Sequence, residues 1–250
     1  MAARWFDCLA RLGRSKTRPY YQTVGTVENL LADMDSFGIE EAVCWHSAAE
    51  ETHPSVGNRL LVEAVANEPR LHPCVVLLPP GTGEFAPPDE HIRELKSQGA
   101  VAARMAPYAH SYDFDAFTCG AVLEALQEHA MPLYVDTGQY FDFPALRELL
   151  GTFGDLTFIF CNTGYRHSRF IYPILQEFEN VYLDISRWEL HNGLEHLLGH
   201  FHPERFLFGT GWPVFTPASV MTMLSCAQIS DGHKSKIAGK NIERLLAGVK

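Results

Sequence analysis

The sequence lacks the features that mark membrane, secreted and nucleic-acid-binding proteins. No apolar run approaches the ~20 residues that span a bilayer, and the basic N-terminal stretch has no apolar region like that of a signal peptide. With 20 Lys and Arg against 30 Asp and Glu, the formal charge is −10, which disfavours nucleic acid as a partner. We therefore expect a soluble, cytoplasmic protein that binds neither nucleic acid nor membranes.

Several short catalytic and cofactor-binding motifs are also missing. The sequence contains no G-x-G-x-x-G, no Walker loop and no G-x-S-x-G, so it predicts no dinucleotide site, P-loop or serine nucleophile of those kinds. Its six cysteines form no C-x-x-C pair, and several stand inside apolar runs. We expect them to be buried free thiols rather than disulfides.

The amino-acid composition is typical of one folded domain. The 250 residues are 46% hydrophobic and 20% charged, which suits a single domain over residues 1–250 with a large buried core. Short apolar runs typical of strands covered on both faces occur at residues 5–9, 42–45, 73–78, 101–105, 133–136, 157–161, 181–185 and 205–208.

Helical patterns alternate with these runs. The first begins at Thr26, a favourable N-cap, and ends before Gly38; the full set is 26–37, 56–67, 89–98, 115–129, 143–150, 171–178, 190–198, 217–227 and 233–247. Eight strands alternating with helices over 250 residues predict an α/β fold of the (β/α)8 TIM-barrel type. An open doubly wound sheet is the alternative, but the first turn lacks the glycine-rich pattern of such sheets.

In a TIM barrel, the functional residues lie where the strands end and the following loops begin. This rule selects a set of polar and aromatic side chains: Arg11, His46, Arg104, Asp136, Asn162, Arg187, Trp188 and Trp212. Arginines gathered at one face of an acidic protein indicate an anionic small molecule, because a guanidinium binds a carboxylate through two hydrogen bonds. The sequence therefore predicts a small carboxylate ligand at the barrel mouth.

Five segments of the sequence resemble one family. They are 6–13 (FDCLARLG), 158–164 (FIFCNTG), 180–186 (NVYLDIS), 203–213 (PERFLFGTGWP) and 241–246 (NIERLL). In order, they resemble the first, sixth, seventh and eighth strands and the terminal helix of the amidohydrolase superfamily, in the branch that includes aminocarboxymuconate-semialdehyde decarboxylase. The resemblance covers nearly the whole chain. It implies a TIM barrel, hydrolase or carboxy-lyase chemistry and, because the family often forms dimers, a homodimer.

The resemblance also implies where the family's divalent metal would be bound. The family's metal-binding His and Asp positions correspond here to Leu9, Arg11, Asp136, Asn162 and Gly211. Leucine and glycine supply no side-chain ligand, and arginine places a permanent positive charge where a cation would sit. We therefore expect no metal and no cofactor, with a shifted site built from Asp136, His46 and Cys8 as the alternative.

The roles of the charged candidates leave two alternatives open. Arg11 and Arg104 either clamp the ligand's carboxylate or neutralise acids inside the barrel, namely Asp7, Asp136 and Asp184. Asp136 either transfers a proton, with its pKa set by burial against a nearby arginine, or forms an ion pair that stabilises the barrel.

The remaining candidates are auxiliary. His46 could act as an acid or base, because a histidine side chain titrates near neutral pH. Asn162 could donate a hydrogen bond to a substrate carbonyl or could equally satisfy buried backbone groups. Arg187, Trp188 and Trp212 either contact the substrate or pack in the core.

Three functions are consistent with these features. The first is a metal-independent hydrolase or lyase that acts on a small carboxylated compound. The second is an inactive barrel that binds an anionic molecule or partners an active homologue. The third is an enzyme with a shifted metal site.

Overall fold

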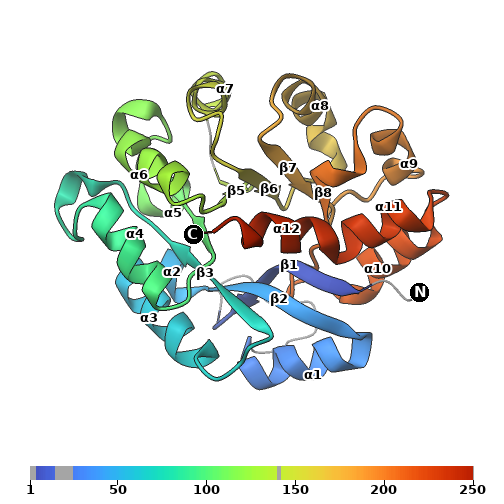
Figure 1. Ribbon diagram of the computed structural model, residues 1–250, viewed down its shortest axis with the longest axis horizontal. Coiled ribbons are helices and arrows are strands. Elements are labelled where there is room, and N and C mark those ends of the chain that lie inside the picture. Colours follow the sequence, from blue (N-terminus) through green and yellow to red (C-terminus); the bar gives the residue numbers. More distant parts are fainter. Residues whose placement is uncertain (1–3, 15–24, 140–141, 250) are drawn as a thin grey trace.

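The computed structural model describes residues 4–14, 25–139 and 142–249, and within them eight parallel strands pair in chain order. The sheet closes on itself, because the Cys8 N–H donates to the Phe208 carbonyl at 2.8 Å and the Arg11 N–H to the Trp212 carbonyl at 2.9 Å. The predicted (β/α)8 barrel is confirmed (Figure 1). Its strands are β1 (Trp5–Leu12), β2 (Ile39–His46), β3 (Leu71–Val76), β4 (Ala102–Arg104), β5 (Leu133–Asp136), β6 (Phe158–Cys161), β7 (Val181–Asp184) and β8 (Phe206–Leu207).

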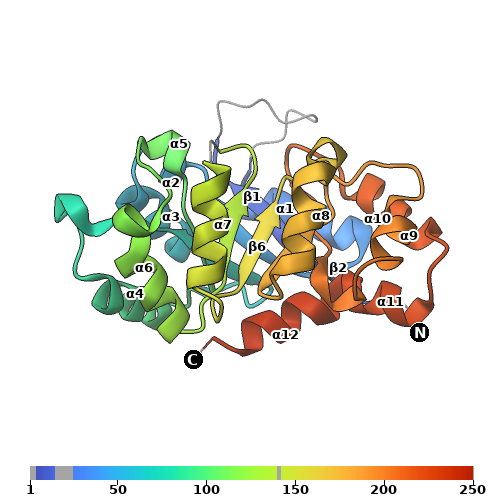
Figure 2. The same ribbon diagram turned by 90° about the horizontal axis from the view of Figure 1, so that it is seen from above.

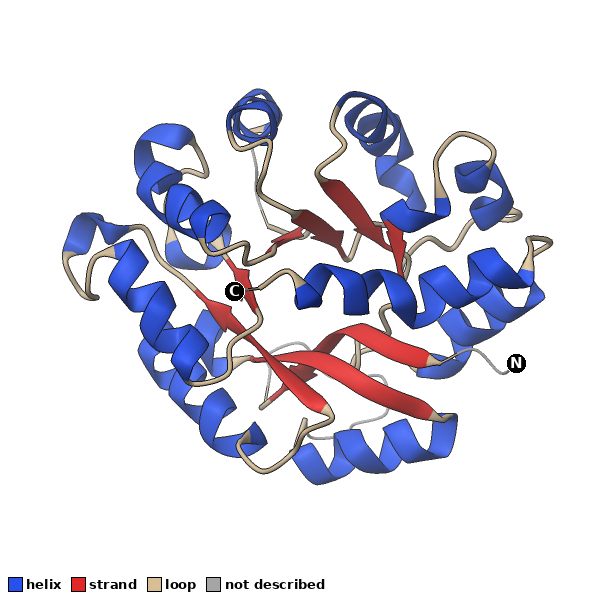
Figure 3. Cartoon of the chain, in the orientation of Figure 1, coloured by secondary structure: helices blue, strands red, loops and turns tan. Residues whose placement is uncertain are grey.

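Helices surround the strands, as Figure 3 shows in blue and red. The α-helices are α1 (Val27–Phe37), α2 (Ala48–Glu51), α3 (Pro54–Val65), α4 (Pro88–Ser97), α5 (Pro107–His110), α6 (Ala116–Glu128), α7 (Phe143–Thr152), α8 (Ser168–Glu177), α9 (Gly193–Leu198), α10 (Pro217–Cys226), α11 (Asp231–Ser235) and α12 (Asn241–Ala247). Short 3-10 or π segments are η1 (Pro80–Thr82), η2 (Tyr165–His167), η3 (Pro203–Arg205) and η4 (Lys236–Lys240).

Local signals in the sequence set the ends of α1. The Thr26 hydroxyl accepts a hydrogen bond from the Asn29 N–H at 3.2 Å, which satisfies one of the free donors at the helix start. Gly38 ends the helix with φ 69°, a left-handed conformation that glycine adopts without a steric cost. Both predicted ends are confirmed.

Several predicted boundaries differ from the observed ones by a few residues, and two of the differences change how the chain is described. The predicted strand 5–9 continues to Leu12, because parallel pairing with β2 extends as far as Leu12 and His46. Arg11 therefore belongs to a strand and not to a loop. The predicted helix 233–247 is divided into α11, the π-helical turn η4 and α12.

The hydrophobic core has two parts. One lies between strands and helices, and the other fills the barrel with side chains such as Tyr134, Ile159 and Leu207. Ile242 and Leu245 of α12 join this inner cluster, and Figure 2 shows α12 at the end of the barrel opposite α5. Since α5 follows the carboxyl end of β4, α12 covers the amino-terminal end and leaves the carboxyl ends of the strands for a site.

The cysteines follow the prediction closely. All six are free thiols, and five of them are buried, whereas Cys226 is exposed. Within the described ranges, no helix combines the length and the apolar character needed to cross a membrane.

Candidate functional site

A cavity of about 350 Å³ opens at the carboxyl ends of the strands. Side chains and backbone from the ends of β1, β2, β4 and β5 and from the loops after β6, β7 and β8 line it. The lining residues are Leu9, Ala10, Arg11, Trp45, Glu50, Arg104, Asp136, Gly138, Gln139, Asn162, Arg187, Gly211, Trp212, Val214 and Phe215. The cavity therefore contains six of the eight side chains that the strand-end rule selects.

Arg104 is the most deeply buried charge of the cavity, with 1% of its surface exposed. Its Nε donates to Glu50 Oε1 at 2.6 Å, its Nη2 to Asp136 Oδ2 at 2.5 Å, and its Nη1 to Cys161 Sγ at 3.4 Å. Its guanidinium also lies 4.5 Å from the centre of the Trp45 ring. Two carboxylates neutralise this arginine, which is the internal ion pair that the sequence left open as an alternative.

Arg11 has a different environment. Its Nε and Nη2 are buried, and no described residue accepts a hydrogen bond from them. Burial lowers the pKa of Arg11, and the neighbouring Arg104 lowers it further, while Glu51 and Glu50 raise it. An arginine stays charged in proteins, so Arg11 brings a positive charge into the cavity wall without a hydrogen-bonded counter-charge among the described residues.

The Asp136 carboxylate is fully engaged by donors. Besides Arg104, the Asn162 side-chain amide donates to Oδ2 at 2.6 Å, and the Gly138 N–H donates to Oδ1 at 2.8 Å. Asn162 adopts a left-handed φ of 55°, which asparagine tolerates better than most residues. The Asn162 amide therefore donates to Asp136, which is neither of the two partners considered for it, a substrate carbonyl or buried backbone groups.

Two further predicted residues lie in the cavity wall. The Arg187 guanidinium lies 4.1 Å from the centre of the Phe215 ring and 3.7 Å from the Glu189 carboxylate, and its Nε has no partner in the described part of the chain. Trp212 donates its indole N–H to Asp33 Oδ2 at 2.7 Å.

His46 and Trp188 lie outside the cavity lining. Trp188 is 0% exposed and belongs to the core between strands and helices. His46 Nδ1 accepts a hydrogen bond from the Ala48 N–H at 3.2 Å, and burial lowers the pKa of this imidazole.

The sequence reasoning missed Glu50, which lines the cavity from α2. Its side chain is 13% exposed and is one of the two carboxylates on Arg104. Glu50 stands four residues beyond the end of β2, so the strand-end rule, extended by one helical turn, would have included it.

The five positions to which the resemblance assigns the family's metal ligands line this one cavity: Leu9, Arg11, Asp136, Asn162 and Gly211. Asp136 is the one carboxylate among them, and a guanidinium and an amide occupy its oxygens. A divalent ion needs several converging N, O or S ligands, so this donor set does not fit one. In residues 4–14, 25–139 and 142–249, no group of three His, Cys, Asp or Glu side chains could hold a metal.

Two more acids are buried inside the barrel, away from the cavity lining. Asp7 accepts hydrogen bonds from the N–H groups of Leu9 and Thr210 and from the Thr210 hydroxyl, and burial raises its pKa to about 6. Asp184 accepts from the N–H and hydroxyl of Ser186, and burial raises its pKa to about 7. The hydrogen bonds of Asp7 join β1 to the segment after β8, and those of Asp184 fix the turn after β7.

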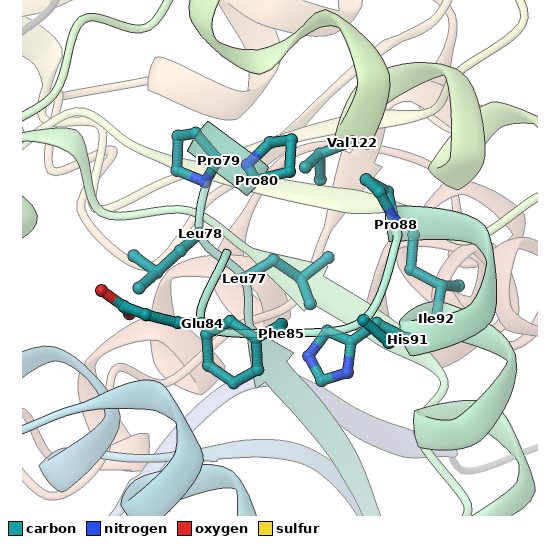
Figure 4. A pocket seen from close by; sticks show the side chains of 11 residues that line it. Leu77, Leu78, Pro79, Pro80, Glu84, Phe85, Pro88, His91, Ile92 and Val122 are labelled. Atoms are coloured by element: carbon teal, nitrogen blue, oxygen red, sulfur yellow. The ribbon is translucent and has the colours of Figure 1, made fainter. Parts of the chain in front are cut away.

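A smaller hollow lies under the loop after β3 (Figure 4). The loop folds over its own apolar side chains, with Phe85 stacked on His91 at 4.7 Å between ring centres. The hollow measures about 20 Å³, which is room for about one water molecule. It is too small for an organic ligand.

The family of the chain follows from its sequence. A family model described as amidohydrolase matches residues 5–247. The chain belongs to this amidohydrolase family, as the resemblance predicted. No curated protein matches the chain significantly in sequence.

Solved structures share the fold over nearly their full length. A 2,6-dihydroxybenzoate decarboxylase from Rhizobium is 14% identical, with a TM-score of 0.76 over 98% of this chain and 99% of that one. A 5-carboxyvanillate decarboxylase from Sphingomonas paucimobilis is 15% identical, with a TM-score of 0.72 over 98% and 99%. A protein described provisionally as a 2-pyrone-4,6-dicarboxylic acid hydrolase from Pseudomonas putida is 16% identical, with a TM-score of 0.72 over 99% of each chain. At these identities the likeness shows the fold.

Proposed function

We propose that this chain binds a small carboxylated compound in the barrel-mouth cavity and acts on it, as a hydrolase or lyase, without a divalent metal ion. The observation that carries the proposal is Arg11, whose buried guanidinium atoms have no hydrogen-bond partner among the described residues. Burial disfavours the charged form of Arg11, and the negative charge of a carboxylate bound in the cavity would favour it. The structural neighbours named as decarboxylases and a hydrolase of carboxylated compounds support the same ligand class.

The charges of the cavity agree with an anionic ligand. Arg11, Arg104 and Arg187 supply three positive charges, and Glu50 and Asp136 supply two negative charges. Arg104 is occupied by both acids, so Arg11 and Arg187 are the cations that remain to attract a carboxylate.

Binding is tested with benzoate by isothermal titration calorimetry. We expect Arg11→Met to weaken benzoate binding by about tenfold or more. The matched control is Arg14→Met, which changes an exposed arginine outside the cavity lining. Equal affinity of the wild type and Arg11→Met would contradict the proposal.

Metal independence is tested by elemental mass spectrometry on untagged protein purified without chelators. We expect far less than one metal ion per chain and benzoate binding that is unchanged by a chelator. About one zinc or manganese ion per chain would contradict this part of the proposal and would favour the shifted metal site.

A second candidate is a barrel that binds the acid and does not transform it. The engagement of Asp136 favours this candidate, because three donors already occupy its carboxylate oxygens and compete with a substrate for them. Product analysis after incubation with benzoate and 2,6-dihydroxybenzoate separates the two. Release of CO2 supports a lyase, whereas recovery of every bound acid unchanged favours the binding-only barrel.

A further inference from the structure

The cavity at the barrel mouth has charges of both signs, and they are unevenly distributed over its wall. Among the described residues, five charged side chains line it: Arg11, Glu50, Arg104, Asp136 and Arg187. Glu50 and Asp136 both pair with Arg104, and we call these three residues the acid–arginine triad. Two acids on one guanidinium leave the triad with an excess of one negative charge. The wall therefore has a negative side as well as the positive side formed by Arg11 and Arg187.

Glu50 presents the negative charge of the triad to the cavity. Its Oε1 accepts the hydrogen bond from Arg104, and no donor among the described residues is bonded to its Oε2. The Glu50 side chain keeps 13% of its surface exposed, against 2% for Arg104. The oxygens of Asp136 are more fully occupied, by donors from Arg104, Asn162 and Gly138. A carboxylate accepts hydrogen bonds at both oxygens, so Glu50 is the acid of the wall that can receive a donor from a ligand.

The negative and the positive side of the wall lie close together. The guanidinium of Arg104 lies 4.5 Å from the centre of the Trp45 ring, and that of Arg11 lies 5.9 Å from the same centre. Burial lowers the pKa of Arg11, whereas the nearby Glu51 and Glu50 raise it, so Arg11 is within electrostatic reach of the triad. A ligand whose two opposite charges are separated by only a few bonds can therefore contact both sides.

The cavity also has room for an apolar part of such a ligand. Between the charged groups, its wall includes Leu9, Trp212, Val214 and Phe215. A cavity of about 150 Å³ already holds a benzene ring, and this one measures about 350 Å³. Ligand sites commonly combine apolar walls with a few polar groups that orient the ligand.

We infer that the compound bound in this cavity is a zwitterion, namely a small amino acid that carries an ammonium group as well as a carboxylate. The inference rests on the proposed function, because it keeps the carboxylate on Arg11 and adds a second contact. The ammonium group donates to Oε2 of Glu50, and its charge offsets the excess negative charge of the triad. Hydrogen bonds between two charged groups are stronger than those between neutral groups. The cavity therefore favours an amino acid over the corresponding acid without nitrogen.

The test compares acids that differ in one group, by isothermal titration calorimetry on the full chain. In the first set, 4-methylbenzoate, 4-(hydroxymethyl)benzoate and 4-(aminomethyl)benzoate share a ring and a carboxylate and differ in an apolar group, a neutral donor and an ammonium group. In the second set, 3-phenylpropanoate and phenylalanine make the comparison over a shorter separation of charges. In at least one set, we expect the ammonium compound to bind about tenfold or more tightly than the other members.

Glu50→Gln keeps the shape of the side chain and removes its charge. It should weaken the binding of the preferred ammonium compound by about tenfold. It should strengthen the binding of the matching acid without nitrogen, because the wall loses a negative charge. A general loss of structure would not produce these opposite changes. The matched control is Glu124→Gln, the same change at an exposed site of α6 outside the cavity lining, which should alter neither affinity.

The outcomes separate this inference from the proposed function. If 4-methylbenzoate or 3-phenylpropanoate binds and no ammonium compound binds more tightly, the zwitterion inference alone is overturned. The same holds if 4-(hydroxymethyl)benzoate matches the preferred ammonium compound, or if folded Glu50→Gln keeps the preference. If none of the acids binds, the proposed function is overturned as well. The comparison on the wild type decides the question if Glu50→Gln does not fold.

Discussion

Two pairs of buried acids in this barrel are accommodated by opposite means. At the mouth, Glu50 and Asp136 share the guanidinium of Arg104. Inside the barrel, Asp7 and Asp184 accept hydrogen bonds from hydroxyl and backbone N–H groups, and no basic side chain among the described residues pairs with them. Where a cation is present the acids are held as ion pairs, and where it is absent burial raises the pKa towards neutrality.

The largest effect should come from removing the shared cation. Arg104→Met removes the cation that is hydrogen-bonded to both Glu50 and Asp136, which should lower the free energy of unfolding by about 3–5 kcal/mol. Chemical denaturation measures this difference. Arg59→Met, an exposed arginine paired with Glu63 on α3, is the control and should change stability little. A loss below about 1 kcal/mol for Arg104→Met would mean that the acids do not depend on it.

The interior acids Asp7 and Asp184 should make the free energy of unfolding depend on pH. Burial raises the pKa of Asp184 from 3.8 to about 7 in the folded protein, so the folded state binds the proton more tightly than the unfolded state. The stability that the protonated carboxyl contributes is therefore present at low pH and lost as the pH rises through about 4 to 7. Asp184→Asn cannot ionise, so the wild type should lose about 2–4 kcal/mol relative to this variant over that range.

Denaturation curves at several pH values measure this loss. The control is Asp155→Asn, at an exposed position, for which the difference from the wild type should be nearly flat. A flat difference for Asp184→Asn as well would show that the interior acids ionise as they do in water.

The fold and part of the site could be predicted because both depend on local patterns. The apolar run 133–136 matches β5 residue for residue, since a short strand buried on both faces leaves a continuous apolar run. The strand-end rule also collected Arg104, Asp136 and Asn162, which meet in three dimensions because parallel strands end at one face.

The rest of the site depends on tertiary structure. Trp188 follows β7, so the strand-end rule selected it, yet its side chain lies in the core. Its N–H donates to the Ile185 carbonyl at 3.0 Å in a tight turn, which the rule does not take into account. Glu50 reaches the cavity from a helix, and the pattern of a sequence does not say which of two adjacent acids, Glu50 or Glu51, faces inward. For the same reason, the sequence does not show that the two acids pair with Arg104 and not with Arg11.

A moderate change in the free energy of unfolding, of opposite sign, should distinguish Arg11 from Arg104. Arg11→Met removes a buried charge whose Nε and Nη2 have no partner among the described residues, and methionine keeps most of the apolar contacts of the side chain. We expect the free energy of unfolding to rise by about 1 kcal/mol or to stay unchanged. If Arg11→Met destabilised the protein as much as Arg104→Met, the distinction between a structural and a ligand-binding arginine would fail.

The smallest effect should come from Arg187, which is partly exposed and stacks on Phe215. Arg187→Met should lower the free energy of unfolding by about 0.5–1 kcal/mol, the usual size of a cation–π contact near the surface. Thermal denaturation of this variant beside Arg11→Met measures it. A loss as large as that of Arg104→Met would place Arg187 among the structural charges.

The course of β1 has a consequence for how this scaffold could diversify. Arg11 stands within a strand whose backbone is bonded to β2 on one side and to Trp212 on the other, whereas Glu50, Arg187 and Phe215 come from the segments beyond the strands. Exchanging those segments would change the size and shape of the acid that fits without displacing the positive charge that attracts it. Libraries of loop variants on this barrel should therefore yield binders of different acids that all retain a preference for anions.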